Sequence, residues 1–320
     1  MEEVDGITYR HFRSPFLRVV LPLRYVRNFA KGTDLLIDNA DVALPWLSPF
    51  FAKCRSITLV HQLVRDVFFD ELPRPISDIG FHLEPLLYRA YSKSKLVAAS
   101  KSTALDLVHC GIPRENISVI SPGCEKPTLS PSTATEREPN AIACVSRLMR
   151  YKGLHFALEA FAKVVRTIPD ASLIVAGTGP YEPELSKLSS KLGLTKNVRF
   201  VGRVSDESKF KLLQHSRVVI SPSRREGFGI SVLEANSVGT PVVGWNVPGL
   251  SDSIVDNVTG LLASFRDLQE FADKMIALLT DERTWNRLSS NATKWALEHS
   301  WEHSAFQFGK LIDETLDDRM

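Results

Sequence analysis

The sequence of 320 residues has few cysteines, little net charge and no long apolar run. Its four cysteines, Cys54, Cys110, Cys124 and Cys144, show no C-x-x-C spacing, which argues against a zinc site or a disulfide framework and favours free thiols in a reducing compartment. A formal net charge of +2 lacks the basic excess of a dedicated nucleic-acid binder. We therefore expect no nucleic acid among its partners.

Two further absences concern membranes and export. No apolar stretch approaches the length of about 20 residues that a membrane-spanning helix needs. The first residues, Met1–Asp5, are acidic and do not resemble a signal peptide. Both absences predict a cytoplasmic protein.

What the sequence does contain is a regular alternation of short apolar runs and amphipathic stretches. This alternation is typical of an α/β protein whose parallel sheets carry helices on both faces. The predicted strands lie at residues 34–37, 57–60, 96–99, 117–120, 141–146, 172–176, 198–201, 217–220 and 241–244. Residues 126–140 are rich in Pro, Ser and Thr and predict a linker. We therefore predict a first domain over 1–125, a second over 141–299 and a separate C-terminal helix over 300–320.

The most informative segment runs from Ser223 to Ala235 and reads S-R-R-E-G-F-G-I-S-V-L-E-A. It follows a predicted strand and leads into a predicted helix, so Glu226 lies in the loop and Glu234 lies inside the helix. Glycines let the backbone approach a ligand, and the free N–H groups of a helix start attract phosphate. Two carboxylates at such a site suit the vicinal hydroxyls of a sugar and a ribose. The alternative is an ordinary strand–loop–helix unit with solvated glutamates.

Two cations follow the first strand of the predicted second domain. Arg147 and Lys152 stand at a strand-to-helix corner, where open α/β sheets bind ligands. An arginine fork and a lysine point charge at this place could neutralise a diphosphate. The R-x4-K spacing is weak by itself, because basic residues are common near helix starts.

The motifs together resemble glycosyltransferase family 4. The R-x4-K pair, the G-x-G-P turn at residues 177–180, the E-x7-E segment and the glycine-proline turns at 246–262 occur in the order of that family. The resemblance covers roughly residues 56–316. It implies the GT-B fold, in which two Rossmann-like domains face each other across a cleft and the last helix crosses back to the first domain.

The resemblance also implies the roles of individual residues. Glu226 would hold hydroxyls of the donor sugar, while Arg147 and Lys152 would stabilise the departing diphosphate. His61, just beyond a strand of the first domain, would lie near the donor sugar, although a lone histidine is as often structural. The other donor-binding positions implied are Gly177, Gly202, Arg203, Val204, Gly227, Phe228, Gly229, Ile230, Leu233 and, for the ribose, Glu234. The G-x-G-P turn is explained equally well as a tight turn at a helix start.

The implied reaction moves a hexose from a UDP- or GDP-sugar to a hydroxyl of a sugar, lipid-linked or small-molecule acceptor, with retention of configuration. The sequence has no D-x-D pattern, so it does not require a metal to bridge the diphosphate. We expect neither a metal nor another cofactor.

The beginning of the chain departs from the family pattern. The opening strand, glycine-rich loop and helix of the family have no counterpart here, and residues 4–8 predict a later strand. We therefore expect a shortened first domain, whose sheet edges need cover from a homo- or hetero-oligomeric partner. Two alternatives stay open: a non-catalytic nucleotide-binding partner subunit and a GT-B sugar-nucleotide epimerase.

Residues 10–31 form a segment rich in basic and aromatic side chains, including Arg13, Arg18, Arg24 and Arg27 and no acid. Such a segment can lie on an anionic membrane surface at the cytoplasmic face. The alternative is a solvated helix face with a buried apolar side.

Overall fold

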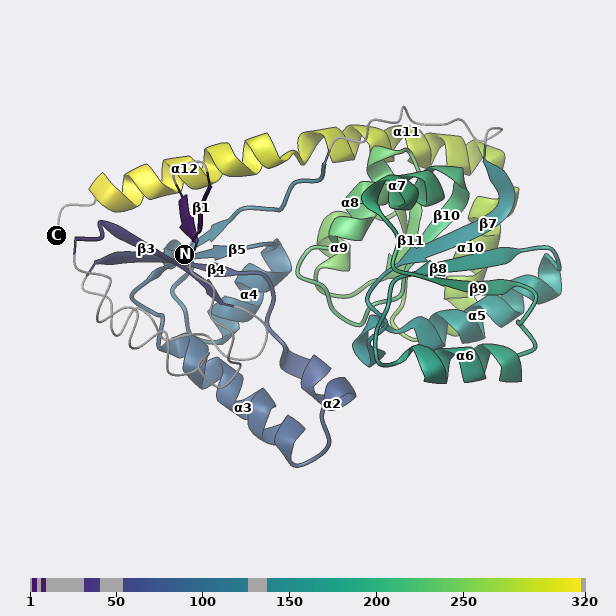
Figure 1. Cartoon of the computed structure of the whole chain (residues 1–320), viewed down its shortest axis with the longest axis horizontal. Helices are drawn as coiled ribbons and strands as arrows, with labels where there is room; N and C mark the ends of the chain where they lie inside the picture. The colour runs from purple at the N-terminus through teal and green to yellow at the C-terminus, as the bar shows by residue number, and fades with distance from the viewer. Residues whose placement is uncertain (1, 5–6, 10–31, 41–53, 126–136, 318–320) are drawn as a thin grey trace.

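The protein is an α/β structure with two parallel sheets, each forming the centre of one domain (Figure 1). The computed structural model describes residues 2–4, 7–9, 32–40, 54–125 and 137–317. The basic segment 10–31 and most of the predicted linker lie outside the described residues. No helix in the described ranges is long and apolar enough to cross a membrane.

The first domain is built on four parallel strands in the order β3-β4-β5-β6. These are β3 (Leu35–Ala40), β4 (Arg55–Val60), β5 (Lys95–Ala98) and β6 (Ile117–Val119), which overlap the four predicted strands. The helices between them are η2 (Arg65–Val67), α2 (Phe68–Glu71), α3 (Ile76–Arg89), α4 (Lys101–His109) and η3 (Arg114–Asn116). Leu96, Leu107 and Ile112 are among the buried side chains of its core.

The start of the chain differs from the prediction of one strand over residues 4–8. Two short antiparallel strands occur instead, β1 (Glu2–Val4) and β2 (Ile7–Tyr9), with Val4 opposite Ile7. They pair only with each other among the described residues and do not extend the parallel sheet.

The second domain contains six parallel strands in the order β12-β11-β10-β7-β8-β9. They are β7 (Glu138–Val145), β8 (Ser172–Ala176), β9 (Val198–Gly202), β10 (Ser216–Ser221), β11 (Val242–Trp245) and β12 (Gly260–Ala263). β7 begins at Glu138, before the predicted domain start at residue 141. β12 was not predicted, because it begins with a glycine and its four residues show no alternating pattern.

Helices cover both faces of this sheet (Figure 1). They are η5 (Arg150–Lys152), α5 (Leu154–Thr167), α6 (Glu182–Lys191), α7 (Asp206–His215), α8 (Ile230–Ser237), α9 (Leu250–Ser253), α10 (Leu268–Thr280) and α11 (Glu282–Glu298). α5 shows why these segments fold as helices. Leu154, Leu158, Phe161 and Val164 recur at helical spacing, so one stripe of the helix is buried against the sheet.

The last helix, α12 (Trp301–Asp317), returns from the second domain and lies along the first (Figure 1). Its Leu311 is buried with Ile57 and Val97 on one face of the first sheet. The chain therefore crosses between the domains twice. The carboxyl ends of β4, β7 and β10 face the space between the domains. In parallel α/β sheets this end of the strands is where ligands bind.

Candidate functional site between the domains

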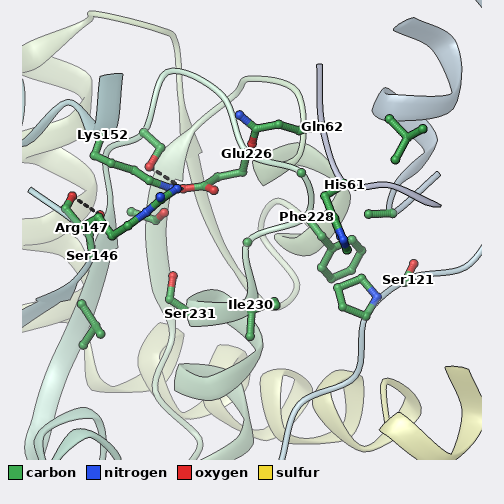
Figure 2. A pocket seen from close by; sticks show the side chains of 18 of the residues that line it. His61, Gln62, Ser121, Ser146, Arg147, Lys152, Glu226, Phe228, Ile230 and Ser231 are labelled. Carbon is green, nitrogen blue, oxygen red and sulfur yellow. Dashed lines mark hydrogen bonds and ion pairs between the residues drawn. The ribbon is translucent and has the colours of Figure 1, made fainter. Parts of the chain in front are cut away.

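A cavity of about 800 Å³ lies between the two domains. The first domain contributes the segment after β4, with His61 and Gln62, and the second contributes the loops after β7 and β10 (Figure 2). The volume falls within the range of about 300–1,000 Å³ that is usual for small-molecule sites. Both domains therefore form a single binding space.

The polar side of the cavity is centred on Glu226. Its carboxylate Oε1 accepts from Lys152 Nζ at 2.6 Å and from Ser223 Oγ at 2.6 Å. Lys152 comes from the turn after β7, and Ser223 comes from the same loop as Glu226. Because Oε1 accepts both hydrogen bonds, the side chain is held in place while Oε2 remains available to accept a hydrogen bond from a ligand.

Arg147 completes the charged group and points toward Lys152 and Glu226 (Figure 2). Its Nη2 donates to the hydroxyl of Tyr151 at 2.9 Å. Cys144 also borders the cavity, but full burial raises the pKa of its thiol to about 12, so it stays neutral. Apart from His61, the ionisable groups lining the cavity carry two positive charges and one negative charge, which favours an anionic ligand.

The N-terminus of α8 adds to this positive side. Gly229, Ile230 and Ser231 line the cavity, and Gly229 caps the helix in the left-handed region with φ 96° and no side-chain cap. The first N–H groups of the helix therefore lack helical partners and carry the positive end of its dipole. Such a helix start can receive a phosphate group.

Gly227 brings the two domains into contact at the cavity. A Cβ on this residue would lie 2.3 Å from the carbonyl oxygen of His61, so a side chain cannot be accommodated without a shift of the backbone. The same carbonyl accepts from Thr103 Oγ1 at 3.3 Å. The glycine therefore places His61 beside the E-x7-E loop.

Ion pairs join the domains next to this contact. Arg224 donates to Asp66 at 2.6 Å and to Asp70 at 3.1 Å, while Arg225 donates to Asp66 at 3.0 Å and to Asp106 at 2.5 Å. Burial raises the pKa of Asp66, but the two guanidinium groups outweigh burial and lower it overall. For Asp106 burial prevails and the pKa is raised. Both arginines of the motif therefore bind the opposite domain and do not line the cavity.

A second group of predicted donor-binding residues lies outside the cavity, at the ends of β8 and β9. Gly177 donates its N–H to the Gly202 carbonyl at 2.7 Å, and Arg203 and Val204 follow directly. Gly177 has φ 136°, and a Cβ there would lie 1.9 Å from the carbonyl oxygen of Ser146. The turn is therefore packed against the strand end that leads to Arg147. This packing requires glycine with or without a ligand.

Glu234 also lies outside the cavity, one helix turn beyond its polar side. Its Oε1 accepts from Lys209 Nζ at 2.7 Å, and Lys209 pairs at the same time with Asp206 at 2.9 Å. Burial raises the pKa of Glu234, and the hydrogen bond and charge of Lys209 oppose this rise. The second glutamate of the motif is therefore also held by a lysine.

Two predicted residues of the motif have buried side chains. Leu233 is fully buried with Phe228, Cys124 and Trp295, and it does not line the cavity. Phe228 borders the cavity at one edge, but its ring packs against that of His299 with 5.5 Å between centroids. Their side chains pack α8 against the end of α11, so any contact of Leu233 with a ligand in this cavity would have to come from its backbone.

Sequence reasoning missed three supporting residues. Ser223 and Tyr151 stand within the predicted motifs, so their spacing to Glu226 and Arg147 could have indicated them. Lys209 has no local signal, because it reaches Glu234 only through the packing of α7 on α8.

The first-domain wall of the cavity is largely apolar. It consists of side chains from the ends of β4, β5 and β6 together with α12, namely Leu59, Val97, Ala99, Ile120, Trp301, Ala305 and Phe308. The cavity therefore has a charged side on the second domain and an apolar side on the first. In the described part of the chain, no group of three or more His, Cys, Asp or Glu residues is arranged to hold a metal ion.

Comparison with known proteins agrees with this geometry. The profile of the family described as Glycosyl transferases group 1 matches residues 125–295. A D-inositol 3-phosphate glycosyltransferase of Corynebacterium glutamicum is 30% identical over 292 residues, covering 85% of this chain and 69% of that protein. The protein of the same name from Corynebacterium urealyticum is 33% identical over 216 residues, covering 62% and 51%. The chain thus spans about half to two thirds of the length of these curated relatives.

Solved structures share the fold at low sequence identity. Sucrose-phosphate synthase from Thermosynechococcus elongatus superposes with a TM-score of 0.77 at 20% identity, covering 95% of this chain and 80% of that one. Anabaena HepE, solved in complex with UDP-glucose, gives a TM-score of 0.75 at 20% identity, covering 94% and 84%. These likenesses confirm the predicted GT-B fold. With the family profile covering more than half of the chain, the protein belongs to the group 1 glycosyl transferases.

Proposed function

We propose that this protein transfers a hexose from a nucleotide-diphosphate sugar to an acceptor hydroxyl with retention of configuration. The observation that carries the proposal is the meeting of Arg147, Lys152, Glu226 and the uncapped start of α8 in one cavity between the domains. A net positive polar side with one positioned carboxylate suits a ligand that is both a diphosphate and a sugar.

The transfer requires stabilisation of the leaving group. When the bond between the anomeric carbon and the phosphate oxygen breaks, negative charge develops on the nucleoside diphosphate. Arg147, Lys152 and the start of α8 line the cavity in which this charge would form, and we infer that they stabilise it. Preorganised positive groups of this kind lower the barrier more than groups that must reorient.

Glu226 and His61 are proposed to act on the sugar. Glu226 Oε2 would accept from donor hydroxyls and fix the ring, and His61 would hydrogen-bond the sugar from the opposite domain or manage the proton of the acceptor hydroxyl. We assign no covalent nucleophile. Retention would then follow from attack of the acceptor on the face that the diphosphate leaves.

The nucleoside would extend from the cavity toward the second group of predicted residues. Glu234 would accept from the ribose hydroxyls, and the backbone at Gly177, Gly202, Arg203 and Val204 would border the base. The structure of HepE with UDP-glucose supports a UDP-sugar as the first donor to test. The apolar first-domain wall suits an acceptor with an apolar part.

Four further features belong to the proposal. Arg147 and Lys152 supply the charge that a metal would otherwise provide, so we propose transfer without a metal; loss of turnover in EDTA would refute this part. We also propose a cytoplasmic protein, a peripheral membrane contact through residues 10–31, and an oligomeric partner on the first domain.

The decisive test is the Arg147→Ala variant, assayed with UDP- and GDP-hexoses. We expect kcat to fall by about a hundredfold, because one preorganised donor to the developing charge is lost. Arg150→Ala is the matched control, since Arg150 is exposed on the same turn and does not line the cavity. If Arg147→Ala changes kcat/KM by less than about threefold, or ~0.7 kcal/mol, the assigned role is wrong. Nucleotide binding by the unmodified protein without any turnover would instead favour a non-catalytic partner subunit.

A further inference from the structure

The α2–α3 region of the first domain has an outer surface made of apolar and basic side chains. Within residues 68–95 the exposed residues are Phe69, Leu72, Pro73, Arg74, Pro75, Ile76, Ile79, His82, Leu83, Leu86, Arg89 and Lys93. No carboxylate belongs to this exposed set. We refer to these twelve residues as the α3 surface.

Four large apolar residues of this surface share one face of α3. Ile76, Ile79, Leu83 and Leu86 follow helical spacing and are 55%, 61%, 41% and 61% exposed. Figure 1 places α3 along the outer side of the first domain, away from α12 and from the second domain. Single exposed leucines are ordinary, but a continuous stripe on one helix indicates an interaction surface.

The acidic side chains of α2 are turned away from this surface. Asp70 accepts from Arg224 at 3.1 Å, and Glu71 accepts from the backbone N–H of Tyr151 at 2.9 Å, so both reach across to the second domain. α2 therefore uses its acids at the domain interface and leaves Phe69 exposed on the outside.

The two acids of α3 are also engaged. Glu84 is buried and accepts from the backbone N–H groups of Val64 and Arg65 at 2.6 and 2.8 Å. The side chain of Asp78 is 43% exposed and lies 3.8 Å from Arg74, so this acid offsets the charge of that arginine. The acids of the region are thus paired within the protein. Arg89 and Lys93 are exposed near the C-terminal end of the apolar stripe.

We propose that the α3 surface docks on a lipid bilayer that contains anionic headgroups. An amphipathic helix binds such an interface by burying its apolar face at the headgroup boundary while cations contact the anionic lipids. A second copy of this chain fits less well, because pairing two α3 surfaces would bring the Arg89 and Lys93 of each copy together, and Asp78, the acid of α3 that reaches solvent, is already paired with Arg74. The inference does not depend on the transfer reaction, since none of the twelve residues lines the cavity.

The test is flotation of the full chain with phosphatidylcholine vesicles that contain or lack phosphatidylglycerol. We expect binding that requires phosphatidylglycerol. The double variant Ile79→Ser/Leu86→Ser should weaken this binding by at least about tenfold, since each substitution removes an exposed apolar side chain that docking would bury in the bilayer. Arg89→Gln/Lys93→Gln should weaken it by roughly twentyfold, with little effect on any residual binding to neutral vesicles.

Leu297→Ser provides the matched control, because Leu297 is 69% exposed on α11 of the second domain and should leave vesicle binding unchanged. Equal binding of the Ile79→Ser/Leu86→Ser variant and the unmodified protein would overturn the proposal, as would absence of binding to the anionic vesicles. A concentration-dependent dimer that Leu86→Ser dissociates, without vesicle binding, would assign the surface to a second copy instead. Activity of the purified variants with a water-soluble acceptor should be unchanged in every case.

Discussion

The two glutamates of the E-x7-E segment are held in nearly the same way, but in different surroundings. Glu226 pairs with Lys152 at 2.6 Å and Glu234 pairs with Lys209 at 2.7 Å, and all four side chains are largely buried. The first pair lines the cavity, and the second lies outside it. We infer that similar pairing serves two different parts of the proposed donor, the sugar at Glu226 and the ribose at Glu234.

The difference lies in what surrounds each pair. Lys152 stands beside Arg147 and the start of α8, so its charge is part of a positive side that faces the cavity. Lys209 is shared between Glu234 and Asp206, so its charge is balanced within the protein. We infer that the first pair supports the chemical step and that the second orients a carboxylate for binding. The following predictions test this distinction.

The largest effect is expected for Lys152→Met. Loss of a positive group beside the leaving diphosphate should lower kcat by about 10²–10³-fold. Lys211→Met is the control, because Lys211 forms an exposed pair with Glu207 at 2.6 Å and should leave kcat unchanged. Steady-state kinetics with saturating donor measure both. A Lys152→Met enzyme with normal kcat and raised KM would assign the first pair to binding as well.

An intermediate effect is expected for Glu234→Ala. Donor KM should rise by about tenfold with kcat nearly unchanged, because the ribose contact is made equally in the ground state and the transition state. Glu207→Ala is the matched control, because Glu207 belongs to the exposed pair with Lys211. A large fall in kcat at saturating donor would contradict the proposed division between the two pairs.

The smallest effect is expected for Lys209→Met, and it depends on pH. Burial raises the pKa of Glu234 and Lys209 opposes this rise, so removing Lys209 should move the pKa of Glu234 further up. A protonated Glu234 is a weaker hydrogen-bond acceptor, so donor KM should rise as the pH is lowered. In the variant this rise should begin at a higher pH than in the unmodified protein. At neutral pH we expect a change of about threefold. Superimposable KM profiles against pH would show that Lys209 does not act on Glu234.

Much of this arrangement could be predicted from the sequence. The alternation of apolar runs predicted the strands of both sheets, and the order of R-x4-K, G-x-G-P and E-x7-E predicted the family. These signals are local, since strand period, glycine turns and motif spacing are properties of short segments. β12 and the β1–β2 pair were missed because short strands carry too few residues for a pattern.

Several contacts at the site could not be predicted from patterns within short segments of the sequence. Arg224 and Arg225 stand inside the most informative segment, but nothing nearby in the sequence indicates that Asp66 and Asp106 of the other domain bind them. For Glu71 of α2 and Glu84 of α3, only the fold shows that they accept from the backbone N–H groups of Tyr151 and Val64, respectively.

The sequence by itself determined the fold class, the family and the two glutamates, because each depends on patterns within a few tens of residues. Only the tertiary structure decided which lysine holds each glutamate and which of them faces the cavity. Lys152 lies 74 positions from Glu226, and Lys209 lies 25 positions from Glu234. Their contacts come from packing of separate strand ends and helices. Such contacts depend on geometry in three dimensions, and no spacing along the chain encodes them.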